Sequence, residues 1–319
     1  MTRAFVSLVS FVLVSAPLTA HAQRFEDIGV RAQGMAGAFV AVADDATATW
    51  WNPAGLATGA FFNGIVEYDS LQQPRKGGDP AGAPLPDWRL HAGGFAVAFP
   101  ALGLSYYRLN ISEIRPPDST AAGPPGRQDQ GVGLGVSSLE INQFGASFGQ
   151  SLGDHLVIAS TLKLLRAQSE THGDADIGAM AVFGAARIGL AIRNVTAPEV
   201  GRGAAAVVLA RQARAGISLT SVGIGRIDQV TVALDADLTR TRTEAGEERQ
   251  VSGGIEAWTL GRRLGLRGGL SANTTGSARP LVAGGASVGV RSAVYVDGQV
   301  TVGTDEARRG WGLGLRVTF

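Results

Sequence analysis

Hydrophobic and polar residues alternate with a period of two from about residue 60 to the end of the chain. In residues 311–319 every odd position is apolar and every even position is glycine or polar, so the two sets lie on opposite faces of a strand. The pattern recurs in segments long enough for tilted strands to cross a hydrocarbon layer. It predicts about fourteen strands, near residues 60–69, 87–99, 102–114, 137–151, 155–168, 175–184, 187–195, 212–222, 228–240, 249–260, 263–274, 280–290, 293–303 and 309–319.

The connections between these strands alternate in length. Those after even-numbered strands are short, as at 100–101, 153–154 and 261–262. Those after odd-numbered strands are mostly longer and more polar, as at 72–86, 115–130, 168–174, 196–210 and 241–248. Membrane barrels have this arrangement, with long extracellular loops, short periplasmic turns and both termini on the periplasmic side. The pattern predicts an all-β fold, a transmembrane antiparallel β-barrel spanning residues 60–319.

A soluble β-sandwich or barrel would also have a period of two. A soluble barrel places its charged face outside, but about fourteen strands enclose an interior too wide for its own side chains to fill. The membrane barrel explains both faces, with apolar residues toward lipid and charged residues such as Glu67, Asp235, Asp297 and Arg316 toward the lumen.

The first 22 residues have the pattern of a secretory signal peptide. Arg3 precedes an apolar run over residues 4–16, and a small-residue site follows at Ala20-His21-Ala22. The run is shorter than the ~20 apolar residues of a membrane-spanning helix, which disfavours a transmembrane anchor. We predict cleavage near Ala22 and localisation in the bacterial outer membrane.

The composition excludes several classes of function. The 319 residues include 45 glycines and no cysteine, and the formal net charge is +1. The near-neutral charge argues against a nucleic-acid partner, and the lack of cysteine excludes disulfides and thiolate chemistry.

Residues 23–59 differ from both the signal peptide and the strands, and we predict that they form a plug segment in the barrel lumen. Small apolar residues and turn-forming residues dominate this part of the chain. Glycine and alanine suit close packing against the inner wall, and Asn52-Pro53 predicts a fixed turn before the first strand. The candidate plug motif consists of Gly34, Gly37, Asp44, Asp45, Asn52, Pro53, Ala54 and Gly55.

No motif predicts catalysis, a metal or a cofactor. Two matches to G-x-S-x-G, around Ser147 and Ser287, fall inside alternating strands, whereas a nucleophile elbow needs a strand-to-helix turn. The histidines have no metal-ligand spacing. Asp44-Asp45 could be a cation site, but such pairs more often begin a helix or turn. We therefore expect no enzyme activity, metal site or cofactor.

The alternation changes phase in the third and fourth predicted strands. Leu102, Leu104 and Tyr106 are followed by Leu109, and Ile141 is followed by Phe144 and Phe148. A β-bulge shifts side chains to the other face in this way, so Tyr106, Leu109, Ile141, Phe144 and Phe148 are candidates for a distortion of the barrel wall. Aromatic residues pointing into the lumen would be the alternative explanation.

The last strand ends in an aromatic residue after strict alternation. Trp311 and Phe319 thereby resemble the C-terminal signal that outer-membrane barrels present to their assembly machinery. We expect the barrel-assembly machinery and outer-membrane lipid to be partners of this chain.

Residues 31–56 resemble the N-terminal segment of the FadL/PorV-type outer-membrane barrels, in the stretches AVADDA (41–46) and NPAGLA (52–57). Residues 111–115 and 193–198 resemble the compact PorV-like branch. The resemblance implies a fourteen-stranded barrel with the N-terminal segment as a plug. It implies transport of hydrophobic small molecules across the outer membrane or, alternatively, an accessory role that binds secretion-system or surface-attachment proteins.

Overall fold

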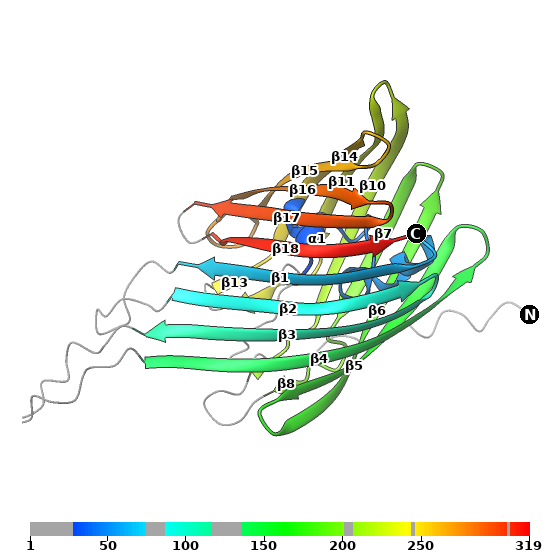
Figure 1. The fold of residues 1–319 in the computed structure, drawn as a ribbon. Helices are drawn as coiled ribbons and strands as arrows, with labels where there is room; N and C mark the ends of the chain where they lie inside the picture. Colours follow the sequence, from blue (N-terminus) through cyan, green and yellow to red (C-terminus); the bar gives the residue numbers. More distant parts are fainter. Residues whose placement is uncertain (1–27, 75–86, 116–134, 201–206, 244–245, 305–306) are drawn as a thin grey trace, which may run out of the picture.

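The protein is a closed antiparallel β-barrel in a computed structural model that describes residues 28–74, 87–115, 135–200, 207–243, 246–304 and 307–319 (Figure 1). Within these ranges fourteen strands form the barrel, and β1 closes it by pairing with β18. The strands are β1 (Asn63–Gln73), β2 (Asp87–Phe99), β3 (Leu102–Arg115), β4 (Gly135–Leu152), β5 (Leu156–Ala167), β6 (Glu170–Phe183), β7 (Ala186–Arg193), β10 (Gln212–Ile224), β11 (Ile227–Asp237), β14 (Gln250–Thr259), β15 (Leu264–Asn273), β16 (Leu281–Arg291), β17 (Val294–Gly303) and β18 (Arg309–Thr318).

The predicted barrel is confirmed, and most strand boundaries lie within a few residues of their predicted positions. The expected loop at 168–174 is wrong, because β5 and β6 are joined by a tight turn in which Gln168 has a φ of 55°. Two small hairpin sheets in the long connections were not predicted. They pair β8 (Glu199–Val200) with β9 (Val207–Val208), and β12 (Thr241–Thr243) with β13 (Gly246–Glu248).

The outer face of the barrel is an apolar belt between two groups of aromatic residues. At the short-turn end, the rings of Phe62 and Phe319 stack with centroids 5.0 Å apart. Farther along the strands, Tyr106 packs against Phe95 on one neighbouring strand and Phe144 on the other. Aromatic girdles at both edges of an apolar belt are typical of membrane barrels. No helix in the described ranges is both long and apolar enough to cross a bilayer.

The described part of the plug segment lies inside the barrel (Figure 1). It contains α1 (Val30–Gly34), α2 (Ala48–Trp51) and the 3-10 helix η2 (Pro53–Thr58). Helix α1 contacts strands β15 to β18 and β1, whereas η2 contacts strands β2 to β6 on the other wall. The segment therefore bridges the lumen and buries its side chains against both walls. The predicted signal peptide, residues 1–22, lies outside the described residues.

Candidate functional site

The candidate site is the plugged lumen, and turn-forming residues shape the plug within it. Gly37 adopts a φ of 85° after α1, a backbone conformation that suits glycine. Asn52 caps η2, with its side-chain oxygen accepting a hydrogen bond from the Ala54 amide at 3.2 Å, and Pro53 occupies the first turn of η2. The Asn52 side-chain amide donates to the Val40 carbonyl at 2.9 Å and to the wall carbonyl of Ala179 at 3.2 Å. Asn52 thus fixes the plug internally and ties it to β6.

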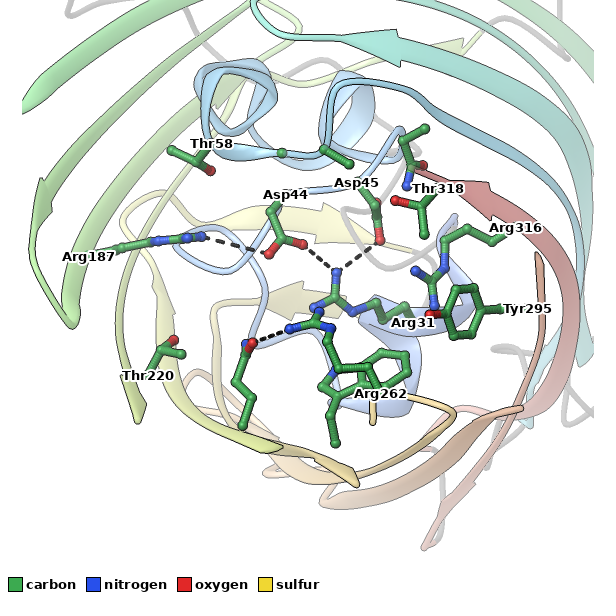
Figure 2. A pocket seen from close by; sticks show the side chains of 15 residues that line it. Arg31, Asp44, Asp45, Thr58, Arg187, Thr220, Arg262, Tyr295, Arg316 and Thr318 are labelled. Atoms are coloured by element: carbon green, nitrogen blue, oxygen red, sulfur yellow. Dashed lines mark hydrogen bonds and ion pairs between the residues drawn. The ribbon is translucent and has the colours of Figure 1, made fainter. Parts of the chain in front are cut away.

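A buried arginine joins the plug to the barrel wall. Arg31 on α1 donates two hydrogen bonds to Glu256 on β14, Nε to Oε1 at 2.7 Å and Nη2 to Oε2 at 2.5 Å. Its Nη1 also lies 2.5 Å from Asp44 Oδ1 and 3.2 Å from Asp45 Oδ2 (Figure 2). Burial lowers the pKa of Arg31, but Asp44, Glu256 and Asp45 outweigh burial and raise it well above its ordinary value. Arg31 therefore remains charged while it joins three carboxylates.

Carboxylates of the wall also bind the backbone of the plug. Asp235 Oδ2 on β11 accepts hydrogen bonds from the amides of Phe39 and Val40, both at 2.8 Å. Glu67 Oε2 on β1 accepts a hydrogen bond from the Val30 amide at 3.0 Å. Because a buried backbone amide without an acceptor is costly, these acidic side chains replace the water that an empty lumen would supply.

Glycines of the wall allow the plug backbone to approach closely. A Cβ added at Gly178 on β6 would overlap Asn52 Oδ1 and lie 2.8 Å from Pro53 Cδ. A Cβ at Gly189 on β7 would lie 2.6 Å from the Val40 carbonyl oxygen. Within the plug, a Cβ at Gly55 would overlap the Ala43 carbonyl. At these positions glycine therefore allows the plug to pack closely, because a larger side chain would clash.

A second group of charges continues from Glu256 along the inner wall. Arg267 on β15 lies 3.8 Å from Glu256 and 3.4 Å from Asp297, measured between nitrogen and oxygen. Arg316 on β18 completes the row with its Nε 3.0 Å from Asp297 Oδ2. Opposite charges alternate along this row, so each buried charge has a partner.

A third group of charges joins β5, β6 and Asn194, the residue that follows β7. The buried Lys163 ammonium lies 2.8 Å from Asp174 Oδ2 and 2.6 Å from Asp176 Oδ1, and it donates to Asn194 Oδ1 at 2.8 Å. These side chains face the lumen from the wall beside η2. Neither this group nor Glu256 was predicted from the sequence. The available signal was a charged residue at an inward position of an alternating strand.

A cavity of about 480 Å³ lies between the plug and the wall at the short-turn end (Figure 2). Its charged lining includes Arg187, whose Nη1 lies 3.9 Å from Asp44 Oδ2, and Arg262, whose Nη1 donates to Gln229 Oε1 at 2.5 Å. Asp45 also accepts a hydrogen bond from the Thr47 amide at 2.9 Å, before α2. Asp44 and Asp45 thus form ion pairs with arginine and support a turn. No group of three or more histidine or acidic residues suited to a metal occurs in the described part of the chain.

The inner wall near the long-loop end is apolar on one side. One row of directly paired inward residues runs Leu71, Leu90, Ile111 and Leu139 across β1 to β4. The next row runs Ala92, Leu109, Ile141 and Ala167 across β2 to β5. We call these eight residues the apolar wall. All eight belong to or pack against the hydrophobic cluster that includes plug residues Phe39 and Trp50. At the same end of β10 to β17 the inward residues include polar ones: Gln212, Asp237, Gln250, Asn273 and Thr301.

No protein-family model matches the sequence, and no curated protein matches it. Solved structures do match. The Ralstonia pickettii toluene transporter TbuX has a TM-score of 0.61 and 12% identity, over 92% of this chain and 99% of its own. The monoaromatic hydrocarbon channel CymD has a TM-score of 0.62 and 12% identity, over 93% of this chain and 99% of its own. A Pseudomonas aeruginosa FadL homologue has a TM-score of 0.55 and 10% identity, over 95% of this chain and 98% of its own.

This chain has the fold of the FadL-type outer-membrane barrels. The predicted resemblance to this fold is thereby confirmed for the barrel. Within the FadL-type fold, both G-x-S-x-G matches lie in strands, Ser147 in β4 and Ser287 in β16. Ser147 shares a hydrogen bond with Thr161 at 2.7 Å, and Ser287 hydrogen-bonds with Arg267 and Asp297. Both serines face the lumen and join neighbouring strands.

The predicted bulge in the barrel wall is wrong. Strands β3 and β4 pair in unbroken register from Leu102 opposite Phe148 to Arg115 opposite Gly135. Leu109 and Ile141 face inward and belong to the apolar wall, whereas Phe144 and Phe148 are exposed on the outer face. The hydrophobic pattern changes phase because the inner face becomes apolar near the long-loop end. The alternative of lumen-facing aromatic residues fails for Phe144 and Phe148 too.

The residues of the predicted assembly signal are exposed on the outside of the barrel, Trp311 in β18 and Phe319 directly after it. Trp311 contacts Tyr68 of β1, with ring centroids 5.7 Å apart. Phe319 exchanges backbone hydrogen bonds with Phe62 at the short-turn end of the barrel. Their role as a signal stays a prediction.

Proposed function

We propose that this chain is an outer-membrane channel that passes small hydrophobic compounds through its interior. Its fold and its apolar outer belt support a place in the outer membrane, with residues 1–22 removed as a signal peptide near Ala22. On this proposal the long loops face outward from the cell, and the plug lies in a lumen whose short-turn end faces the periplasm.

The observation that carries the proposal is the apolar wall. A channel for ions or sugars has a polar, water-filled interior. Here two adjacent rows across β1 to β5 turn leucine, isoleucine and alanine inward, where most of these side chains are buried in the hydrophobic cluster that includes plug residues. Transfer of a hydrocarbon from water onto such a surface is favourable by roughly 25 cal/mol per Å² of apolar area buried. The wall therefore favours apolar compounds over polar ones.

The plug serves this function by closing the lumen to water and ions. Its charged contacts hold it against β14 and β11, and its Trp50 packs edge-on against Tyr107 of β3 with ring centroids 5.7 Å apart. Tyr107 lies next to Leu109 on the same inward face. The plug thus borders the apolar wall, and a compound that moved along this wall would meet the plug near Trp50.

Deletion of the gene tests the proposal against its alternative. Uptake of toluene should fall in the deletion strain and return when the wild-type chain is supplied, whereas uptake of glucose should not change. Unchanged toluene uptake together with an altered set of secreted proteins would instead favour an accessory role in secretion. Purification from the native membrane adds a second criterion, since a secretion accessory should bring a large protein partner with it.

A further inference from the structure

Polar side chains interrupt the outer face of the barrel on strands β3, β4 and β5. Arg108 on β3 is directly paired with Asn142 on β4, and Asn142 is directly paired with Arg166 on β5. The three residues form one outward row, with 58% of the Arg108 side chain exposed. The next outward residues toward the short-turn end on these strands are Tyr106, Phe144 and Leu164, so this row marks the start of a polar patch on the outer face.

The patch lies directly beyond the edge of the apolar belt. Two residues nearer the short-turn end, the outward row consists of Tyr106, Phe144 and Leu164, which pair across the same three strands. The rings of Tyr106 and Phe144 contact each other with centroids 4.8 Å apart. Aromatic rings of this kind sit at the level of lipid headgroups. On the membrane placement proposed above, the change from apolar to polar outward residues at the Arg108, Asn142, Arg166 row corresponds to the edge of the hydrocarbon.

A groove of about 590 Å³ runs over this part of the wall, lined by Ser138, Glu140, Asn142, Phe144, Arg166 and Gln168. Glu140 forms an ion pair with Arg108 and accepts a hydrogen bond from Asn142 at 2.9 Å. Within the described part of the chain, no hydrogen bond or ion pair joins the Arg166 guanidinium to another residue. The groove thus has an apolar floor at Phe144 and an arginine available for an anion.

We propose that this groove binds the phosphorylated headgroup of a lipid in the leaflet at the long-loop end. Arg166 would hold the phosphate, since a guanidinium binds phosphate oxygens in a two-point geometry. Asn142 would donate from the adjacent strand, and Phe144 would contact the upper acyl chain. Two arginines against one glutamate leave the patch cationic, and basic groups at a membrane surface attract anionic lipid. The inference rests on the membrane placement given above and not on transport.

Lipid A in nanodiscs, in its bisphosphorylated and dephosphorylated forms, tests this site by native mass spectrometry of the purified barrel. The wild-type barrel should retain the phosphorylated form at least tenfold more than the dephosphorylated form, and Arg166→Gln should abolish that difference. Arg166→Lys should retain part of the difference. Arg226→Gln is the matched control because Arg226 is exposed in the β10–β11 turn at the other end. It should behave as wild type.

Three outcomes would overturn the proposal. Equal retention of both lipid forms by the wild-type barrel would remove the role of phosphate. An unchanged preference in Arg166→Gln would place the phosphate elsewhere. Displacement of the lipid by millimolar inorganic phosphate would identify a site for soluble anions. Heat-modifiable gel mobility checks that each variant is folded, and because binding is measured without transport, a failure here leaves the channel proposal standing.

Discussion

Arg31 of the plug and Glu256 of the wall form a two-point ion pair inside the barrel, with nitrogen–oxygen distances of 2.7 and 2.5 Å. The two residues are 225 positions apart in sequence, so the pair fixes the plug to a strand that lies far along the chain. Both side chains are buried, so loss of either partner leaves a buried charge unpaired and lowers the stability of the plugged barrel.

Replacement of Arg31 should destabilise the plugged barrel. Arg31→Gln leaves Glu256, Asp44 and Asp45 near one another without their shared cation, and breaking a buried ion pair costs about 3 to 5 kcal/mol. Denaturant unfolding in detergent should give a lower free energy of unfolding, and planar bilayers should record a higher ion conductance. Arg187→Gln is the control, since its contact with Asp44 is 3.9 Å long and partly exposed. Wild-type conductance and stability in Arg31→Gln would refute a closing role for the pair.

A methyl group at Gly178 should disturb the packing of the plug against β6. Gly178→Ala would press against Asn52 and Pro53, and overpacking of this kind typically costs about 1 to 3 kcal/mol. Gly173→Ala on the same strand is the control, because a Cβ there meets no atom within 4 Å. The thermal unfolding temperature should fall for Gly178→Ala only. An equal fall in both variants would show that strand propensity is the cause.

Loss of the Asp235 carboxylate should remove the hydrogen bonds that hold residues 39–40 of the plug against β11. Asp235→Ala removes the acceptor of the Phe39 and Val40 amides, which are buried and would then lack a partner. Hydrogen exchange at these two amides should become faster by at least tenfold. Asp154→Ala, in the exposed β4–β5 turn, should leave both rates unchanged. Protected amides in Asp235→Ala would contradict the assigned hydrogen bonds.

A polar side chain in the apolar wall should reduce uptake of hydrocarbons. Leu109→Asn keeps a similar size but replaces apolar surface with an amide, so toluene should partition less well into the interior. Uptake in cells should fall several-fold. Leu109→Met keeps the surface apolar and should transport as wild type. If Leu109→Asn folds normally and transports toluene at the wild-type rate, the compound does not use this wall.

The barrel could be predicted because its signal is local. Alternation with a period of two and glycine-rich turns gave fourteen strands with nearly correct boundaries, as in residues 102–114 for β3. The plug could be placed because a wide lumen needs filling and because residues 31–56 resemble the N-terminal segment of FadL/PorV-type barrels. Its partners could not be predicted, since Glu256 and Asp235 are about 200 residues away in sequence. Such pairs depend on the closure of the barrel, and no sequence period encodes them.

The phase change in β3 and β4 illustrates a second limit. Leu109 and Ile141 break the alternation in the sequence, and a bulge was a reasonable explanation because both cases produce the same pattern. Only the strand register distinguishes a shifted strand from an inner face that becomes apolar. The outward residues Arg108 and Asn142 carried the complementary signal, because they are polar where the neighbouring inward residues are apolar.

Photolabelling with an apolar diazirine compound tests most directly whether hydrophobic molecules enter the barrel along the apolar wall. The purified barrel in nanodiscs would be labelled, digested and mapped by mass spectrometry, with excess toluene as competitor. We predict label on inward Leu109 and Ile141 that toluene suppresses, in addition to lipid-phase label on outward Phe144 and Phe148 that toluene leaves unchanged. Label confined to the outward residues of β3 and β4 would contradict the account.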